Sequence, residues 1–442
     1  MRFMRFCTFV AVLSWVAMGL ASEPKYKAAG KPRPKAAKSA AGPRLDPAAV
    51  KALADRIDEL GGTVTYNDQE EIVEVDLSAG EATDEDLQKI ATLGTLEKLK
   101  LFGSAIHDSG IKHLAKIASL KDLELHNTAI TEQGVIALCD LPNLQALNLR
   151  RSTNLRDPVL AHLKKMPKLQ NLSILYNGFT DEGLVYLKDL TNLRALDLRG
   201  NVQMGDAGLA NLKGLVNMRA LKLRNFYLTD AGLDHFLAMT RLRSLAIEDA
   251  DSISDAGLAK LAAFKDIEEL DIFRCSKVTD AGLKSLAGLA NLRRLKLRGL
   301  PITGSGLAAL KGLTNLKDLL DLSETLTDDA GLAHVANFPN LQRLDLWQAK
   351  ITDGGLAHLE ALTKLQWLSL KETAVTDQGL VHLKGLADLA TLNLEGTKIT
   401  DAGLEHLAGL KNLKVLGVNL TGVTPEGKNK LQQALPKLKI SQ

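Results

Sequence analysis

Leucine and other aliphatic residues return along this chain at a fixed interval from Ile72 almost to the C-terminus. The first apolar residue of each unit follows that of the previous unit by 24 or 25 residues, and fifteen units fill residues 72 to about 437. The shared pattern is L-x-x-L-x-L-x-x-(N/T/S/C)-x-x-I-T-D-x-G-L-x-x-L-x-x-L-x-x. Internal periodicity of this length indicates a stack of short structural repeats.

Each unit combines two apolar spacings, which predict two kinds of element. In "LATLNLEG", Leu392 and Leu394 alternate with polar residues, as in a short strand. In "TDAGLEHLAGL", Leu404, Leu407 and Leu410 recur every third residue and give a short helix one apolar face. A single unit would expose these leucines to solvent. Stacking buries them, and each buried leucine stabilises the fold by roughly 1.5–3 kcal/mol. We therefore expect an α/β solenoid with a parallel sheet on its concave face and short helices on its convex face.

Polar residues at the start of each predicted helix follow their own pattern. Thr or Ser precedes the helix in 12 of 15 units, and Asp follows in 12 of 15, as in Thr400 and Asp401. The hydroxyl can accept from N–H groups of the first turn, and a carboxylate there meets the positive end of the helix dipole. Because a catalytic group would not be needed so often, we interpret these residues as helix caps.

Seven of the nine histidines also share one helix position. They are His113, His162, His235, His334, His358, His382 and His406. A metal ladder or a pH switch is one interpretation, and a position tolerated at the edge of repeat packing is the other. Neighbouring helices lie about 8–10 Å apart, whereas zinc ligands sit about 2 Å from the metal, so we favour packing and expect no metal site.

The sequence holds no motif of a known catalytic or cofactor site. It lacks a Gly-rich phosphate loop, C-x-x-C, H-E-x-x-H and G-x-S-x-G. We expect no cofactor and a protein that is not an enzyme. Cys139 and Cys275 lie more than five repeats apart, too far for a disulfide bond, which needs Cα atoms within about 7 Å.

The N-terminal region is predicted to direct export. Residues 1–21 combine a basic start, "MRFMR", with the 15-residue uncharged run "FCTFVAVLSWVAMGL" and small residues Gly19 and Ala21, as in a secretory signal peptide. The run is shorter than the roughly 17–25 residues of a membrane span, although an uncleaved anchor is the alternative. We expect no transmembrane span after signal removal, and a periplasmic, cell-surface or secreted protein.

Two further segments precede the repeats. Residues 22–45, rich in Ala, Lys and Pro, are predicted to be a disordered basic linker, either a spacer or a segment (23–44) that adheres to an anionic envelope polymer. Residues 46–71 are predicted to form a helix-strand cap, with Asp46 as N-cap, Pro47 in the first turn and Gly61 at the end of the helix. Residues 438–442 form the C-terminal end.

Net charge argues against nucleic acid as a partner. Of the 55 basic and 52 acidic residues, nine basic and one acidic residue precede residue 45, so residues 45–442 carry 46 basic and 51 acidic residues, a net charge of −5. Nucleic-acid binding would require a basic stripe or patch on the folded body.

The units "LTNLRALDLRGN", "KITDGGLAHLEAL" and "KVTDAGLKSLAGL" resemble leucine-rich repeats of the cysteine-containing, ribonuclease-inhibitor-like type. Together with the signal peptide, they are most similar to exported bacterial leucine-rich repeat proteins, and they also resemble the arcs of F-box proteins in ubiquitin ligases. The resemblance implies a horseshoe solenoid that binds other proteins without catalysis. No F-box-like helical segment precedes the repeats, and the signal peptide argues against the cytosol. Phe226, Leu300 and a predicted bulge at Leu319–Leu322 depart from the pattern.

Side chains between the strand leucines should line the concave face. The candidate partner-binding residues are Arg150, Tyr176, Arg199, Lys222, Arg224, Phe273, Arg298, Trp347 and Trp367. Like charges at Arg199, Lys222 and Arg224 favour an acidic protein segment or an acidic polysaccharide as partner; the alternative is a solvated face whose charges Asp197 and Glu248 offset.

Two tryptophans mark a second part of the predicted concave face. Trp347 and Trp367 are expected to be exposed there, as in binding hot spots. The alternative is cation–π packing on Lys371 and Arg343. Macromolecular binding, most simply of a protein, is the function that we expect, and a structural envelope scaffold is its alternative.

Overall fold

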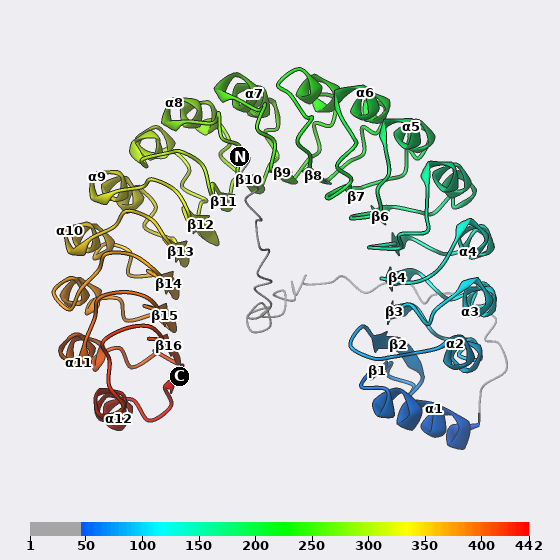
Figure 1. Cartoon of the computed structure of the whole chain (residues 1–442), viewed down its shortest axis with the longest axis horizontal. Helices are drawn as coiled ribbons and strands as arrows, with labels where there is room; N and C mark the ends of the chain where they lie inside the picture. Colours follow the sequence, from blue (N-terminus) through cyan, green and yellow to red (C-terminus); the bar gives the residue numbers. More distant parts are fainter. Residues whose placement is uncertain (1–45, 442) are drawn as a thin grey trace, which may run out of the picture. The chain divides into compact units, whose positions relative to one another are not determined.

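The structure, a computed structural model, describes residues 46–441, and these form an open arc of stacked repeats with strands inside and helices outside (Figure 1). All seventeen strands of this part of the chain belong to one sheet. The predicted α/β solenoid with a concave parallel sheet is therefore confirmed. The predicted signal peptide and linker lie outside the described residues. Within residues 46–441, no helix has the length and apolar character needed to cross a membrane.

Helix α1 (Pro47–Glu59) and a short hairpin cover the first repeat. Asp46 accepts a hydrogen bond from the N–H of Ala48, as expected of its cap, and the apolar face of α1 buries Leu53 and Ile57. Strand β1 (Thr63–Tyr66) pairs antiparallel with β2 (Ile72–Leu77). This hairpin gives the first repeat a neighbour on the side where no earlier repeat exists.

From β2 onward, each strand pairs in parallel with the next strand of the chain. The strands that follow are β3 (Lys98–Phe102), β4 (Asp122–His126), β5 (Ala146–Asn148), β6 (Asn171–Ser173), β7 (Ala195–Asp197), β8 (Ala220–Arg224), β9 (Ser244–Glu248), β10 (Glu269–Phe273), β11 (Arg294–Lys296), β12 (Leu319–Asp321), β13 (Arg343–Asp345), β14 (Trp367–Ser369), β15 (Thr391–Asn393), β16 (Val415–Gly417) and β17 (Lys439–Ile440). Equivalent leucines stay in register, as in Leu99, Leu123 and Leu147. The buried leucines thus form continuous columns through the stack.

Short helices occupy the convex side. The α-helices are α2 (Asp84–Ile90), α3 (Asp108–Leu114), α4 (Glu132–Leu138), α5 (Asp181–Leu184), α6 (Asp206–Leu209), α7 (Asp255–Lys260), α8 (Asp280–Leu283), α9 (Asp329–Leu332), α10 (Asp353–Leu356), α11 (Asp401–Leu404) and α12 (Pro425–Ala434). Several continue as a 3₁₀ turn, such as Glu405–Leu407 after α11. A 3₁₀ helix has three residues per turn, so leucines spaced by three, such as Leu404 and Leu407, face the core together.

The repeated Asp joins one repeat to the next. Asp377 Oδ1 accepts from the N–H of Thr400 at 2.7 Å, and its Oδ2 accepts from the Thr400 hydroxyl at 2.6 Å. Equivalent pairs are Asp108–Thr131, Asp157–Thr180, Asp206–Thr229, Asp230–Ser254, Asp255–Thr279, Asp280–Thr303, Asp329–Thr352, Asp353–Thr376 and Asp401–Thr424. We call this the Asp–Thr clamp.

The clamp corrects the interpretation of the Asp as a cap of its own helix. The Thr does act as expected, since the Thr400 hydroxyl accepts from the N–H of Ala402 in α11. The carboxylate that follows it, Asp401, however, bonds to Thr424 of the next repeat. These hydrogen bonds lower the pKa of Asp401, the Thr424 hydroxyl contributing most, so the Asp stays ionised at neutral pH.

The glycine of T-D-x-G-L makes room for the clamp. A Cβ placed on Gly403 would lie 2.3 Å from Asp377 Oδ1, and one on Gly257 would lie 2.1 Å from Asp230 Oδ1. Such separations are far below van der Waals contact, so a side chain at this position would displace the carboxylate of the previous repeat. The glycine is therefore a packing requirement and not a helix breaker.

A second ladder, which the sequence analysis did not anticipate, runs along the edge of the stack before the strands. Asn192 Nδ2 donates to the carbonyl of Pro167 at 2.9 Å, and Asn412 Nδ2 donates to that of Ala387 at 2.9 Å. Asn143, Asn217, Asn291 and Asn315 make the same bond to the previous repeat. Each of these bonds satisfies a turn carbonyl that the sheet leaves without a partner.

The bulge predicted near Leu319–Leu322 is wrong. In β12, Leu320 pairs in register with Leu295 and Leu344. The irregularity lies after the strand, where Leu326 is 50% exposed and Thr327 is fully buried. Asp328, not Thr327 as expected, caps α9 by accepting from the N–H of Gly331 at 2.8 Å. The loop absorbs the irregularity because a strand shift would turn its leucines out of the core.

We predict that Gly403→Ala destabilises the solenoid by about 2 kcal/mol, because the new methyl group overlaps Asp377. Gly409→Ala is the matched control: no atom lies within 4 Å of a Cβ at that position, so its unfolding midpoint in urea should stay close to that of the wild type. In an Asp377→Ala/Gly403→Ala double variant the loss should be smaller than the sum of the single losses. Equal effects of Gly403→Ala and Gly409→Ala would contradict the clamp.

Candidate functional site

Pairing of the strands places the candidate residues on one concave face. Arg224, Glu248 and Phe273 follow one another in register across β8, β9 and β10, and Asp197 pairs with Lys222. By their place along the arc, we group the nine candidates into two clusters. The Tyr176 cluster holds Arg150, Tyr176, Arg199, Lys222 and Arg224, and the Trp347 cluster holds Phe273, Arg298, Trp347 and Trp367.

Tyr176 is the centre of the first cluster. The guanidinium carbons of Arg151 and Arg150 lie 5.3 and 6.0 Å from its ring centroid, and its hydroxyl accepts from Arg224 at 3.0 Å. The ring lies against Gly200, where a Cβ would be 2.2 Å from the ring. A tyrosine held on three sides in this way is a rigid, half-buried part of the concave face.

Two arginines of this cluster, Arg199 and Arg224, are paired with carboxylates within the protein. Arg199 contacts Asp197 at 2.8 Å and Glu248 at 3.0 Å, and Arg224 contacts Asp249 at 2.5 Å. Hydrogen bonding to Asp197 raises the pKa of Arg199 further above its usual range. For Arg199, the alternative of a solvated face whose charges are offset by Asp197 and Glu248 is therefore the correct one. Among the described residues, Lys222 has no carboxylate within 4 Å.

Next to this cluster, the concave face is hollowed. A pocket of about 300 Å³ is lined by small residues such as Ala146, Ala195 and Ala220 and by the charged side chains of Asp122, Glu124, Asp197 and Lys222. Burial raises the pKa of Asp122, whereas the His126 ring, whose Nε2 lies 3.2 Å from a Glu124 oxygen, lowers that of Glu124. The pocket therefore has a small-residue floor with charges of both signs around it.

The Trp347 cluster is a stack of cations and rings. The guanidinium carbon of Arg298 lies 5.1 Å from the Phe273 ring centroid and 4.9 Å from that of Trp347, and Lys371 Nζ lies 6.0 Å from the same indole. Ser323 occupies this position in the intervening repeat and is small enough for Arg298 to reach across. Glu324 accepts hydrogen bonds from Arg298.

Neither tryptophan is as exposed as expected. Trp347 and Trp367 are both half-buried, because cations from neighbouring repeats cover their rings. Arg343 lies 5.1 Å from the Trp367 ring centroid, and the two residues pair in register between β13 and β14. The cation–π alternative thus describes both tryptophans, and each ring keeps part of its surface open to solvent.

Two carboxyl groups lie side by side next to this cluster. Asp321 and Asp345 pair in register between β12 and β13. Burial, followed by repulsion from Asp321, raises the pKa of Asp345 to about 6, and burial also raises that of Asp321. The N–H of Trp347 donates to Asp345 at 3.1 Å, which ties the carboxyl to the tryptophan backbone.

Thiols and histidines of the described chain show no reactive arrangement. Burial raises the pKa of Cys275 to about 12 and also raises that of Cys139, so neither is a thiolate at neutral pH. In the histidine column, His162 bonds to Glu132 and His382 to Glu360, at 2.8 and 2.6 Å. No three His, Cys, Asp or Glu side chains of residues 46–441 come together as a metal site.

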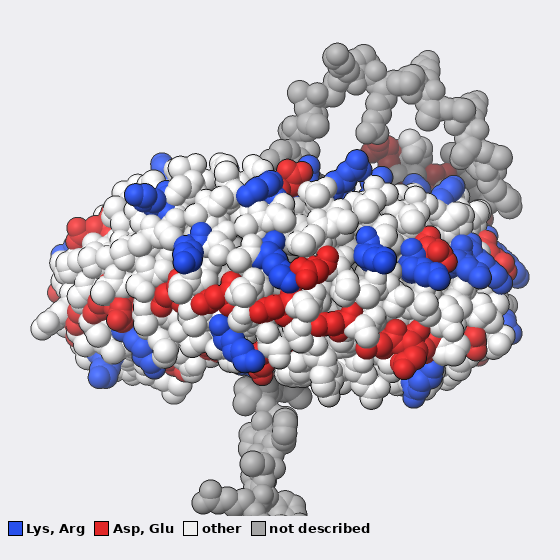
Figure 2. Space-filling view, turned by 90° about the horizontal axis from the view of Figure 1, so that it is seen from above, with Lys and Arg blue, Asp and Glu red and all other residues white. Residues whose placement is uncertain are grey.

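Outside the concave face, two surface features were missed or only partly anticipated. Phe226, noted as a departure from the repeat, is 50% exposed beside Tyr227, which is 65% exposed. A groove lined by Lys168, Arg194, Arg219 and Arg241 lies along one edge of the stack. The convex side in Figure 2 instead mixes acidic residues with Lys and Arg, so neither sign of charge covers it.

The fold and the repeat pattern define the described chain as a leucine-rich repeat solenoid. A leucine-rich repeat family profile matches residues 189–213, 265–287 and 387–408. An internalin of Listeria monocytogenes is similar in structure, with a TM-score of 0.51 and 22% identity over 89% of this chain and 94% of the internalin. A leucine-rich repeat protein of Leptospira interrogans gives a TM-score of 0.50 and 20% identity over 80% and 92%. At these identities the likeness concerns the fold alone. No curated protein matches the sequence.

We predict that Asp345→Asn stabilises the protein in a pH-dependent way. With a native pKa of about 6, above that of an unfolded aspartate, the native state favours the protonated acid. Its contribution to stability is full below about pH 4 and is lost as the pH rises through about 6. The neutral amide should therefore raise the free energy of unfolding by about 1–2 kcal/mol near pH 8 and by little near pH 4.

Thermal unfolding at the two pH values measures this difference. Asp271→Asn is the matched control on the same face, because Asp271 contacts Lys296 at 3.0 Å and its loss should not stabilise the protein near pH 8. A gain for Asp345→Asn that is the same at both pH values would contradict the burial argument.

Proposed function

We propose that this protein binds another protein through its concave face, with the Trp347 cluster as the centre of the contact. The observation that carries the proposal is the stack of Phe273, Arg298 and Trp347, built from side chains of separate repeats. Aromatic residues and arginine dominate the binding energy of protein interfaces when they are rigid and partly desolvated beforehand. Both conditions hold here.

The internal pairing of the concave arginines bears on the kind of partner. A purely acidic ligand would have to displace Glu324 from Arg298 and Glu248 from Arg199. A partner that packs an apolar group on the open part of the rings and hydrogen-bonds at the periphery avoids that cost. The small-residue pocket beside Lys222 offers a second place for an inserted side chain.

A non-enzymatic role is part of the proposal. The two thiols have raised pKa values and are not nucleophiles at neutral pH, and the T-D pairs serve as clamps between repeats. We also propose that the repeats are of the cysteine-containing, ribonuclease-inhibitor-like type. Two observations support this repeat type. One is the 24–25-residue period, and the other is the position of Cys275, which is buried and bonds to the carbonyl of Ile247 in the previous repeat.

We further propose that the protein is exported and acts outside the cytoplasm. The support lies in the sequence of residues 1–21, with a basic start, an uncharged apolar run and small residues before position 22. Residues 22–45 would then place a basic linker between the export signal and the solenoid. In the alternative function, a structural envelope component, that linker would hold the protein to an anionic surface.

We predict that Trp347→Ala weakens partner binding about tenfold or more, because it removes the ring on which Arg298 and Lys371 pack. Partners crosslinked to the full chain would be identified by mass spectrometry and then titrated as purified proteins. Tyr186→Ala, which removes a 38% exposed aromatic ring from the convex side, is the matched control. Trp347 and Trp367 are the only tryptophans after residue 15, so tryptophan emission should shift on binding. Partners bound equally by both variants would rule out this site.

We predict that expression in a bacterial host yields a mature protein beginning near Ser22, because the small residues before that position suit signal cleavage. The N-terminus of the protein recovered from the extracytoplasmic fraction is determined by intact mass and N-terminal sequencing. Deletion of residues 23–44 should release the protein from envelope fragments if the linker holds it there, and salt should do the same. Full-length protein confined to the cytoplasm would refute export.

A further inference from the structure

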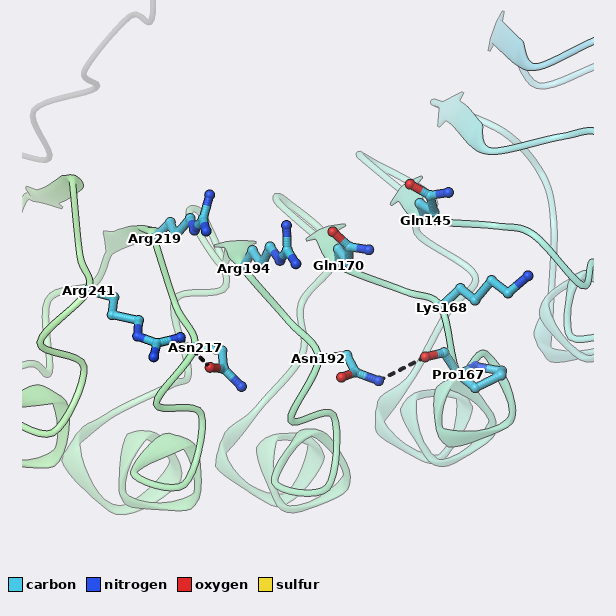
Figure 3. Close-up of a pocket in the computed structure, with 9 residues that line it drawn as sticks. All are labelled: Gln145, Pro167, Lys168, Gln170, Asn192, Arg194, Asn217, Arg219 and Arg241. Atoms are coloured by element: carbon cyan, nitrogen blue, oxygen red, sulfur yellow. Dashed lines mark hydrogen bonds between the residues drawn. The ribbon is translucent and has the colours of Figure 1, made fainter. Parts of the chain in front are cut away.

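A groove of about 350 Å³ lies on the edge of the solenoid where strands β5 to β8 begin (Figure 3). Its residues form two rows. Gln145, Gln170, Arg194 and Arg219 each stand directly before one of these strands. Pro167, Lys168, Asn192, Asn217 and Arg241 lie in the turns between helix and strand. Both rows come from consecutive repeats, so the groove runs along the stack.

The charge of this groove differs from that of the edge around it. Of the described residues, four cationic ones line it and no acidic one does. On either side of it, cations of the same edge pair with acids of a neighbouring repeat, as in Lys121–Glu97 at 2.5 Å and Arg243–Glu268 at 3.3 Å. The groove thus interrupts a pattern of neutralised charge.

Within residues 46–441, the side-chain hydrogen bonds of the groove cations go to neutral groups. Lys168 bonds to the amide oxygen of Asn143 at 2.5 Å, and Arg241 to that of Asn217 at 3.2 Å. Arg194 and Arg219 are exposed and, among the described residues, make no ion pair. Their residues stand one strand apart, and like charges at that spacing cost free energy. An anion bound between them would recover it.

We propose that this groove binds an extended acidic peptide segment of a partner protein. Guanidinium groups bind carboxylates through paired hydrogen bonds, and the side-chain amides of Gln145 and Gln170 can both donate to and accept from a peptide backbone. No aromatic ring of residues 46–441 lines the groove, so these residues do not supply the stacking on which single-stranded nucleic acid binding depends. Strands about 4.8 Å apart give the row from Gln145 to Arg219 a length of roughly 15 Å, or about four to five extended residues.

This site does not depend on the concave face. Its side chains stand before the strands and in the turns, whereas those of the Trp347 cluster stand within and after the strands. The two surfaces can therefore be tested separately, and loss of one leaves the other intact. A partner with an acidic tail could contact both.

The test uses the full chain and a fluorescently labelled oligo-glutamate peptide of about eight residues, long enough to span the groove. Fluorescence anisotropy should show binding that weakens with added salt, and an oligo-glutamine peptide of equal length should bind about tenfold or more weakly. Arg194→Glu/Arg219→Glu should reduce glutamate-peptide affinity by about tenfold or more. Lys284→Glu/Lys311→Glu makes the same change of charge away from the groove and should have little effect.

Three outcomes would overturn the proposal. The first is equal affinity of the Arg194/Arg219 and Lys284/Lys311 variants for the glutamate peptide. The second is equal binding of glutamate and glutamine peptides by the wild type. The third is tighter binding of a polyuronate that the Arg194/Arg219 variant loses, which would make the ligand a polysaccharide. If charge reversal impairs folding, Arg194→Gln/Arg219→Gln replaces it and should show a smaller loss of glutamate-peptide affinity. Trp347→Ala, on the concave face, should leave binding of the peptide to the groove unchanged.

Discussion

The Asp–Thr clamp is the contact on which the regularity of this solenoid depends. Buried leucines alone would favour stacking, but apolar packing is non-directional and would tolerate small rotations between repeats. The clamp fixes the separation of neighbouring helix starts through two hydrogen bonds to one carboxylate, at 2.7 and 2.6 Å for Asp377 and Thr400. Each clamp requires a glycine in the next helix, such as Gly403, so three residues of the motif act as one unit.

Fixed register on the convex side determines what appears on the concave side. Because equivalent strand positions align from β2 to β17, one residue per repeat adds to each concave column. Long side chains then reach across more than one repeat, as Arg298 reaches Trp347 past Ser323 and Arg199 reaches Glu248. The proposed binding surface is therefore a property of neighbouring repeats together, and no single repeat contains it.

The sequence was sufficient to predict the fold, the concave columns and the Thr caps, because each follows from spacing within one repeat. It was insufficient wherever the partner lies in another repeat. The helix dipole gave Asp377 a local explanation, while its actual partner stands 23 residues later in Thr400. Trp347 was expected to be exposed because its position in the repeat faces the concave side. Cations from other repeats cover its ring, however. The edge groove went unnoticed because its cations occupy two different repeat positions.

Charge pairing separates the surfaces of the molecule by physical role. On the concave face, Arg199, Arg224 and Arg298 each contact a carboxylate of the protein, so their main effect is to hold side chains in fixed positions. At the edge, Arg194 and Arg219 have no such partner among the described residues, and their charge stays available. A rigid aromatic face favours shape-selective contact, whereas open cations favour fast, salt-sensitive association. One partner with an apolar anchor and an acidic tail would use both properties.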